Sequence, residues 1–243
     1  MSLPRTVVLF DMDRTLVDIH TGRLFLRFLR EQGEISLLEI ARKRFWLFQY
    51  GLGWVNAEQV AIGLGAEYRD QPEEQLRERC RLWFASHVRS WVSNVGRKRV
   101  RQHQAAGHAV AMVTSSLRQM AQPLADELSI PHLICSDLVI KDRTFTGSFE
   151  LPLCYGAGKL ARASELVTSL GSDLQHTVFY TDSITDVPLL AAVGHPIAVN
   201  PDVRLRRLAR SRGWQIEEWT KADRPGVFPA WAAFDSQPSG TER

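Results

Sequence analysis

The chain has 243 residues, of which 44% are hydrophobic and 23% are charged, and these ordinary globular proportions exclude a wholly disordered chain and a coiled coil. Its 30 basic and 27 acidic residues give a net charge of +3, a surplus too small to indicate a polyanionic partner by itself. The three cysteines are widely spaced, which predicts neither a disulfide framework nor a zinc site and favours a reducing, cytoplasmic location. The first apolar run, Val7 to Phe10, is too short for a signal core or a membrane span, so we expect no membrane partner.

Short apolar runs recur along the chain, and they are typical of strands buried on both faces of a parallel sheet. The expected strands are Thr6–Phe10, Ala109–Val113, His132–Cys135, Thr177–Tyr180, Ile197–Val199 and, with the weakest pattern, Trp214–Ile216. The expected helices between them are Leu117–Leu128, Lys159–Leu170, Asp186–Val193 and Val203–Ser211. This alternation predicts a doubly wound, Rossmann-like α/β core, in which ligands bind beyond the carboxyl ends of the strands.

The stretch from residue 18 to 95 interrupts the alternation and predicts a small helical cap domain inserted after the first strand. Its amphipathic segments are Leu24–Arg30, Leu37–Tyr50, Ala57–Leu64 and Glu73–Trp91. It holds the tryptophans Trp46, Trp54, Trp83 and Trp91, and core packing of these rings is favoured over a substrate-binding box.

A second insertion, Leu138–Glu150, has two β-prone arms around Lys141–Arg143 and predicts a β-hairpin flap. We therefore expect an α/β core over residues 1–17 and 96–236, a helical cap over 18–95, and a flexible polar tail over 237–243.

Two carboxylates, Asp11 and Asp13, directly follow the first expected strand. Side chains two residues apart on extended backbone point to the same side, so these carboxylates would repel each other unless a cation or a shared proton lay between them. Mg²⁺ prefers oxygen ligands of this kind. The alternative is a pair of solvated aspartates that cap a turn.

Two further carboxylates, Asp182 and Asp186, follow the run Thr177–Tyr180. Capping of the next helix, with Thr185 as a plausible N-cap, could explain Asp186 alone. It does not explain four aspartates at two strand ends, so a metal site is favoured.

Two other features complete a candidate anion site. Thr114 and Ser115 end the strand Ala109–Val113 with hydroxyl and backbone N–H groups, which indicates either an anion seat or simple helix capping. Lys159 stands at a helix start, where the helix dipole disfavours a cation. Its placement is explained if an anion or a carboxylate cluster lies opposite, and the alternative is a side chain that extends into solvent.

The candidate residues together resemble, in order and spacing, the four motifs of the haloacid dehalogenase (HAD) superfamily. They are Asp11-x-Asp13-x-Thr15, Thr114, Lys159 and Asp182-x-x-x-Asp186. The helical insertion looks like the cap of its phosphoserine-phosphatase-like subgroup. The resemblance extends from about Arg5 to Trp219.

The resemblance implies a Mg²⁺-dependent phosphatase acting on a small phosphorylated metabolite. Asp11 would be the nucleophile that forms an aspartyl-phosphate, and Asp13 the acid and base. Magnesium would be held by the Asp11 and Asp182 carboxylates and the Asp13 carbonyl, with Asp186 acting through water or by steadying Lys159. Thr114, with Ser115 beside it, would bind the phosphoryl group, and Lys159 would offset its charge. Asp13 argues against dehalogenation, because a halide leaving group needs no proton.

The chain departs from the subgroup at three positions. His20 stands where phosphoserine phosphatases carry a glutamate that recognises the substrate amine, so we expect a phosphomonoester other than phosphoserine. His20 itself either contacts the substrate or is an exposed cap residue. Thr181 and Thr185 replace the usual glycine and asparagine of the fourth motif.

Two other functions are consistent with parts of the sequence. A phosphotransferase would pass the same aspartyl-phosphate to an acceptor hydroxyl. The basic runs at residues 97–101 and 204–212 could bind nucleic acid, but no recognised motif accompanies them, and solvated helix faces are favoured. We expect no nucleic-acid partner and a monomer or weak homodimer.

Overall fold

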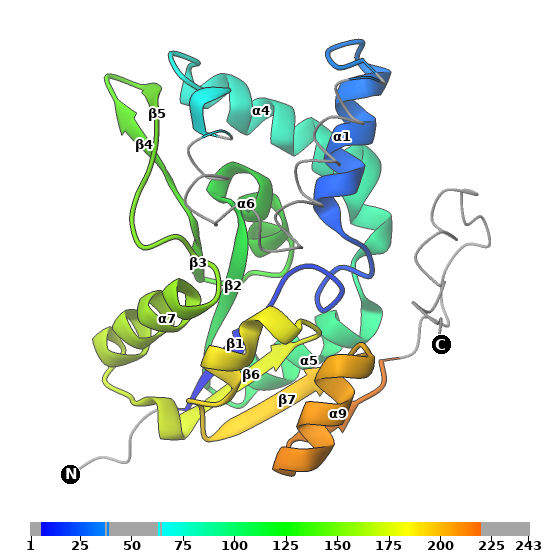
Figure 1. The fold of residues 1–243 in the computed structure, drawn as a ribbon, viewed down its shortest axis with the longest axis vertical. Coiled ribbons are helices and arrows are strands. Elements are labelled where there is room, and N and C mark those ends of the chain that lie inside the picture. The colour runs from blue at the N-terminus through cyan, green and yellow to red at the C-terminus, as the bar shows by residue number, and fades with distance from the viewer. Residues whose placement is uncertain (1–5, 37, 39–62, 64, 220–243) are drawn as a thin grey trace, which may run out of the picture.

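The computed structural model describes residues 6–36, 38, 63 and 65–219. Six parallel strands form its central sheet in the order β3-β2-β1-β6-β7-β8 (Figure 1). The strands are β1 (Val7–Phe10), β2 (Ala109–Leu117), β3 (His132–Ser136), β6 (Thr177–Thr181), β7 (His195–Val199) and β8 (Gln215–Glu217). The predicted Rossmann-like α/β sheet is therefore confirmed, with β1 at its centre between β2 and β6.

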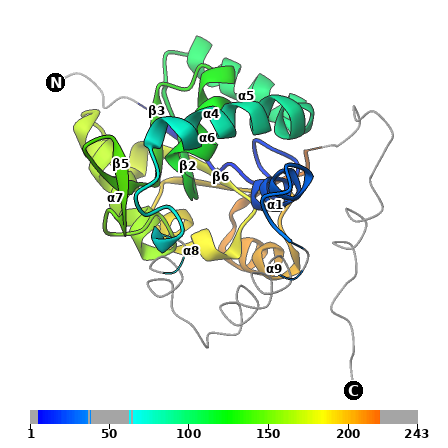
Figure 2. The same ribbon diagram turned by 90° about the horizontal axis from the view of Figure 1, so that it is seen from above.

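Helices cover both faces of the sheet, which is why all four residues of β1 are buried. Val8 and Phe10 of β1 belong to one hydrophobic core, and Val7 and Leu9 belong to the other, as expected for side chains that alternate along a strand. The first core is covered by α5 (Asn94–Ala105) and α6 (Arg118–Glu127), and the second by α7 (Ala157–Ser169), α8 (Val187–Leu190) and α9 (Val203–Arg212) (Figure 2).

Three elements differ from the sequence-based expectation. Strand β2 continues to Leu117, with a register shift between Val113 and Leu117, so Thr114 and Ser115 lie in an irregular strand end and not at a helix start. The predicted helix Asp186–Val193 is only the four-residue α8, preceded by a 3₁₀ turn over Ile184–Asp186. Helix α5 was not among the helices expected between the strands, because polar and basic residues occupy most of it; only its basic run, residues 97–101, was interpreted as a solvated helix face.

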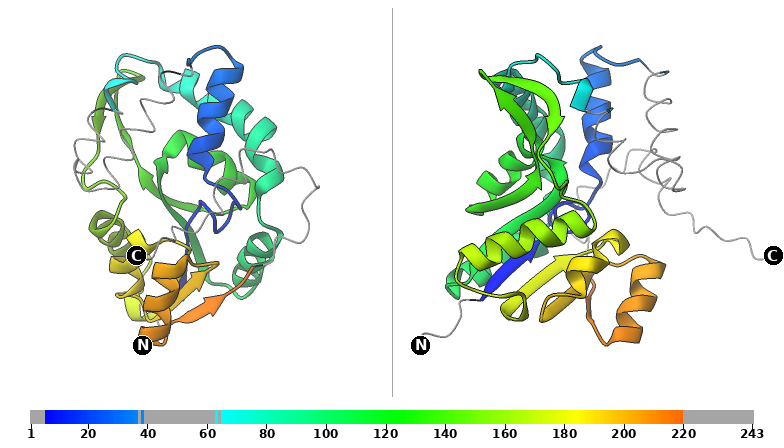
Figure 3. Two further views of the ribbon diagram at one scale, coloured as in Figure 1. Left: turned by 45° about the vertical axis from the view of Figure 1, so that its right-hand side comes forward. Right: turned by 60° about the vertical axis from the view of Figure 1, so that its left-hand side comes forward.

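The cap region contributes α1 (Thr21–Glu31) and α4 (Glu73–Trp83), followed by a π-helical turn, Phe84–Val88, and a 3₁₀ turn, Arg89–Trp91. Figure 3 shows α1 and α4 together beyond the carboxyl ends of the central strands. Trp83 is fully buried, and the centroid of its ring lies 5.3 Å from that of Phe25, so Trp83 is a core residue. Several sequence-based predictions lie outside the residues that the structure describes: the helical segments Leu37–Tyr50 and Ala57–Leu64, apart from residues 38 and 63, and the tail 237–243. Trp46, in the first segment, and Trp54, between the two segments, also lie outside the described residues.

The expected flap is an antiparallel hairpin of β4 (Leu138–Lys141) and β5 (Thr144–Phe149). Asp142 and Arg143 form its turn with φ of 49° and 65°, and two positive φ angles are the backbone pattern of a type I′ hairpin turn. The hairpin also pairs with the cap region, because Phe145 exchanges backbone hydrogen bonds with Asp70 (2.9 Å) and Gln71 (3.0 Å).

Among the described residues, no helix combines the length and the apolar character that crossing a membrane would require.

Candidate active site

Asp11 is the first residue after β1, and its backbone N–H donates to the Tyr180 carbonyl of β6 at 2.9 Å. This bond joins the ends of the two central strands and brings Asp11 close to the segment after β6. The Asp11 residue is only 7% exposed. Burial raises the pKa of Asp11 well above its usual value, and the charges of Asp186 and Asp182 raise it further, while Lys159 lowers it.

Lys159, in the first turn of α7, is buried and forms two ion pairs. Its Nζ donates to Asp11 Oδ1 at 2.9 Å and to Asp186 Oδ2 at 2.8 Å. Burial opposes the charge on Lys159, but the charges of Asp11 and Asp186 outweigh that effect and raise its pKa. The lysine is therefore a fixed positive charge between two carboxylates, and it does not extend into solvent.

Asp186, which is 1% exposed, also contacts Thr181 at the end of β6. Thr181 Oγ1 lies 2.7 Å from Asp186 Oδ2, the oxygen that Lys159 also contacts. The fourth motif thus contributes a hydroxyl to the site as well as two carboxylates. Thr185, by contrast, is exposed and caps no helix: Ser183 is the N-cap of the 3₁₀ turn, and Asp186 that of α8.

Asp13 lies beyond β1, where helix α1 begins. The backbone N–H of Thr21, the first residue of α1, donates to Asp13 Oδ1 at 3.0 Å, so this carboxylate takes the place of an N-cap side chain. Burial raises the pKa of Asp13, and the hydrogen bonds from Thr21 and the charge of His20 lower it. His20, the residue before α1, is therefore close enough to influence Asp13 electrostatically.

Asp182 is 9% exposed and pairs with Arg14, whose Nε lies 3.0 Å from Asp182 Oδ2. Burial raises the pKa of Asp182 to about 7; Arg14 opposes this shift, and Asp186 and Asp13 add to it. Arg14 has a φ of 56°, which is uncommon for a residue with a side chain. Sequence reasoning missed this arginine, because its residue type and position carried no signal for the pairing.

Thr114 is 2% exposed, and its Oγ1 accepts a hydrogen bond from Ser116 N at 3.2 Å. Its neighbour Ser115 is exposed. Both residues follow Val113 on β2, the strand beside β1, so they stand at the same edge of the sheet as Asp11.

The donor set fits a hard divalent cation. Asp11, Asp13, Asp182 and Asp186 carry four formal negative charges, and Lys159 and Arg14 supply two positive ones. The repulsion among the buried carboxylates is the kind that a cation relieves. Across the part of the chain that the structure describes, no group of three or more acidic, histidine or cysteine side chains is arranged so that these side chains alone could hold a metal ion. The expected set has two carboxylates and one backbone carbonyl, which leaves room for the waters that Mg²⁺ retains.

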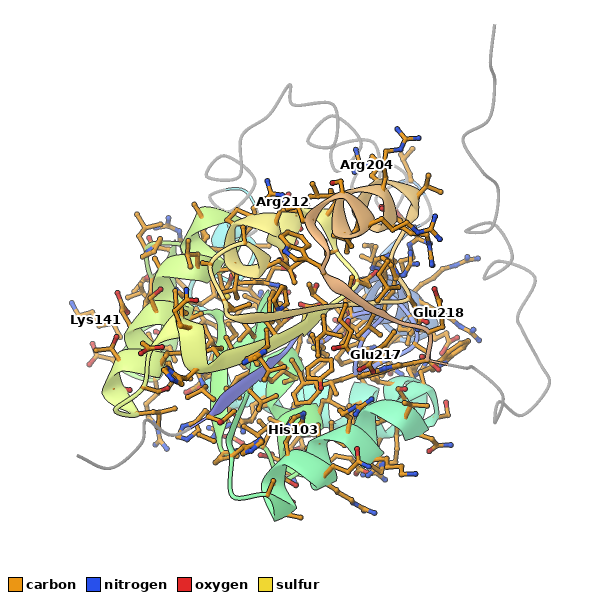
Figure 4. All side chains as sticks on the ribbon, turned by 90° about the horizontal axis from the view of Figure 1, so that it is seen from below. His103, Lys141, Arg204, Arg212, Glu217 and Glu218 are labelled. Atoms are coloured by element: carbon orange, nitrogen blue, oxygen red, sulfur yellow. The ribbon has the colours of Figure 1, made fainter. Side chains whose placement is uncertain are left out.

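The basic runs lie outside this cluster of carboxylates, on α5 and α9. Figure 4 labels Arg204 and Arg212, both of α9. Several of these arginines pair with carboxylates: Arg97 with Glu127 (3.0 Å), Arg99 with Glu217 (2.8 Å) and Arg206 with Glu218 (2.5 Å). This pairing supports their interpretation as solvated helix faces.

Comparison with known proteins defines the class. Residues 8–191 match the model of the haloacid dehalogenase-like hydrolase family, and the chain belongs to that family. It is 30% identical over 249 residues to a phosphoserine phosphatase of Mycobacterium tuberculosis, covering 92% of this chain and 75% of the relative. It is 27% identical over 217 residues to a histidinol-phosphatase of Neisseria meningitidis, covering 87% and 98%.

Solved structures show the same fold. A protein of unknown function from Bordetella pertussis superposes with a TM-score of 0.82 at 30% identity, covering 90% of this chain and all of the other. A phosphoserine phosphatase that holds an analogue of the phospho-aspartyl intermediate superposes with a TM-score of 0.60 at 19% identity, over 88% and 93% of the two chains, and this likeness shows the shared fold. The protein is a phosphatase-type enzyme of the haloacid dehalogenase-like family.

Proposed function

We propose that the protein hydrolyses a small phosphomonoester through a covalent aspartyl-phosphate on Asp11, with Mg²⁺ as cofactor. The observation that carries this proposal is the buried Lys159 bridge between Asp11 and Asp186, 2.9 Å and 2.8 Å long. It holds a carboxylate at the end of β1 and compensates its charge, which is what attack on a phosphate dianion requires.

In the first step an Asp11 carboxylate oxygen attacks phosphorus, and the bond between phosphorus and the substrate oxygen breaks. Asp13, protonated, gives its proton to that leaving oxygen, and an alcohol departs. The raised pKa of Asp13 supports this role, because burial favours its protonated form.

In the second step Asp13, now a carboxylate, takes a proton from water as the water oxygen attacks phosphorus. The bond between phosphorus and Asp11 breaks, inorganic phosphate leaves, and Asp13 is again protonated. Thr114 and Ser115, at the neighbouring strand end, would hydrogen-bond the phosphoryl oxygens.

Magnesium, held by the carboxylates of Asp11 and Asp182 and the carbonyl of Asp13, would offset negative charge on the phosphoryl group. Asp186 would steady Lys159. The pairing of Asp182 with Arg14 uses Oδ2, so the other oxygen of this carboxylate lies outside that ion pair.

The substrate we propose is a small phosphorylated metabolite, as the similarity to a phosphoserine phosphatase and a histidinol-phosphatase supports, with the cap over residues 18–95 selecting it. Because His20 replaces the amine-recognising glutamate, we infer a substrate other than phosphoserine. His20, whose charge influences Asp13, would contact the part of the substrate that leaves with the proton from Asp13.

The test is phosphate release from an aryl phosphate by the purified chain. We expect turnover with Mg²⁺, loss of turnover with a chelator, and a loss of at least about 10³-fold in Asp11→Asn, because a neutral amide is a poor nucleophile. The control is Asp173→Asn, which changes an exposed aspartate outside the site. Unchanged turnover in Asp11→Asn would remove the nucleophile assignment.

The same assay with added glycerol distinguishes transfer from hydrolysis. A phosphatase releases as much inorganic phosphate as alcohol, whereas a phosphotransferase releases less phosphate and forms glycerol phosphate. We expect equal release. A screen of phosphorylated metabolites compared by kcat/KM then identifies the substrate.

A further inference from the structure

Thr181 is the last residue of β6, and its side chain is fully buried. Its Oγ1 has two hydrogen-bond partners in the site. It lies 2.7 Å from Asp186 Oδ2 and 3.1 Å from the backbone nitrogen of Ser183. The chemistry of these partners determines where the hydroxyl proton points.

A backbone N–H can only donate, so Ser183 donates to Thr181 Oγ1. An ionised carboxylate can only accept, so the single hydroxyl proton of Thr181 is directed to Asp186 Oδ2. The same oxygen accepts from Lys159 Nζ at 2.8 Å, and Lys159 also donates to Asp11 Oδ1 at 2.9 Å. A continuous chain of hydrogen bonds therefore runs from Thr181 through Asp186 and Lys159 to Asp11.

We propose that Thr181 is a positioning residue for the nucleophile: its hydroxyl orients the Asp186 carboxylate, and this carboxylate fixes Lys159 against Asp11. This inference rests on the proposed function of Asp11.

The physical reason is the freedom of the groups in the chain. A carboxylate rotates easily about its last side-chain bond, and a lysine has a flexible four-carbon stem. One charged hydrogen bond between two such groups leaves both able to move. The rigid end of β6 supplies a second donor to Asp186, which selects one orientation of the carboxylate and hence one position of the ammonium group.

The decisive pair of variants is Thr181→Val, which keeps the shape and removes the hydroxyl, and Thr181→Ser, which keeps the hydroxyl. With aryl phosphate and Mg²⁺ we expect Thr181→Val to lower kcat about tenfold with KM within about twofold, because a misplaced nucleophile affects the chemical step. We expect Thr181→Ser to retain kcat within about twofold.

Thr177→Val is the matched control. Thr177 begins the same strand, is equally buried, and donates its hydroxyl to the Asp173 carbonyl at 2.8 Å. It is remote from Asp186, so Thr177→Val should lose stability as Thr181→Val does and keep the wild-type kcat. Equal kcat in Thr181→Val and wild type, or equal losses in the serine and valine variants, would overturn the proposal.

A crystallographic measurement separates this inference from the proposed function. In Thr181→Val, or in Thr181→Ala if the valine variant does not fold, we expect Lys159 Nζ to move out of hydrogen-bonding distance of Asp11, and in Thr181→Ser to stay. An unmoved lysine in the hydroxyl-free variant contradicts the positioning role. Failure of the wild type to release phosphate contradicts the proposed function and leaves the structural result standing.

Discussion

Lys159 is the single positive charge that two deeply buried carboxylates, Asp11 and Asp186, share. Removing one partner of a buried ion pair leaves a charge that water cannot reach, and this costs more than the pair contributes. The site therefore depends on Lys159 for folding as well as for chemistry.

We expect Lys159→Met to lower the free energy of unfolding by about 3–5 kcal/mol at pH 8 and to abolish phosphate release. The loss should shrink at pH 5.5. The folded-state pKa of Asp11 is already raised, and without the lysine it rises further, so the folded state gains protons and stability as the pH falls. Urea unfolding at both pH values measures the effect.

The control for this prediction is Lys141→Met. Lys141 is exposed on the flap, far from the sheet (Figure 4), and its replacement should change stability by less than about 0.5 kcal/mol. A Lys159→Met protein as stable as wild type at pH 8 would show that the carboxylates are not charged there.

At the scale of elements, helix α7 is placed by a close backbone contact. Its N-cap Gly156 has a φ of 53°, a conformation that favours glycine. A Cβ on Gly158, one residue before Lys159, would stand 2.0 Å from the Leu153 carbonyl oxygen. The loop before α7 thus packs directly on the helix turn that carries Lys159.

Gly158→Ala should consequently force α7 away from the loop. We expect a stability loss of about 1–3 kcal/mol from overpacking and at least a tenfold loss of kcat, because Lys159 moves with the helix. Thermal unfolding and phosphate release measure the two effects.

The comparison variant is Gly22→Ala in α1, where a Cβ would meet nothing within 4 Å. It should keep stability or raise it by up to about 1 kcal/mol, because alanine is the better helix former. Similar behaviour of the two variants would show that the contact beside Gly158 has no effect.

At the scale of the whole molecule, His103 of α5 contacts Tyr180 of β6 and so links this helix to the central sheet (Figure 4). Its ring nitrogens lie 2.9 Å from His108 Nδ1 and 3.0 Å from the Tyr180 hydroxyl, and Arg99 and Glu217 are the charged groups near it. Burial, with His108 and Arg99, lowers the pKa of His103 to about 4. The folded state therefore favours a neutral imidazole at the contact between α5 and Tyr180 of β6.

The pH dependence of stability follows from this shift. Since the unfolded histidine titrates near 6.5, the unfolded state binds more protons, and the contribution of His103 is complete above pH 6.5 and is lost as the pH falls toward 4. We expect His103, which is half-buried, to contribute a loss of about 1–2 kcal/mol over this range, measured as the difference in pH dependence between wild type and His103→Asn. Equal pH dependence of the two proteins in urea unfolding would contradict the assignment.

The sequence by itself was sufficient to predict the parallel sheet and the place of the site. Apolar runs mark strands buried on both faces, and parallel strands end at one edge, so Asp11, Thr114 and Asp182 were expected together before any contact was known. The hairpin flap followed from its β-prone arms. The extent of α5 and the shortness of α8 did not follow from the sequence, because helix ends and lengths depend on packing as much as on local preference.

Only the tertiary structure decided which atoms meet within the site. Three contacts each join a side chain to one of several groups within reach. They are the ion pair of Arg14 with Asp182, the capping of α1 by Asp13, and the hydrogen bond from Thr181 to Asp186. Local sequence determines which segments form strands and where these strands end. The choice among charged partners depends instead on burial and on side-chain rotamers that the whole fold imposes.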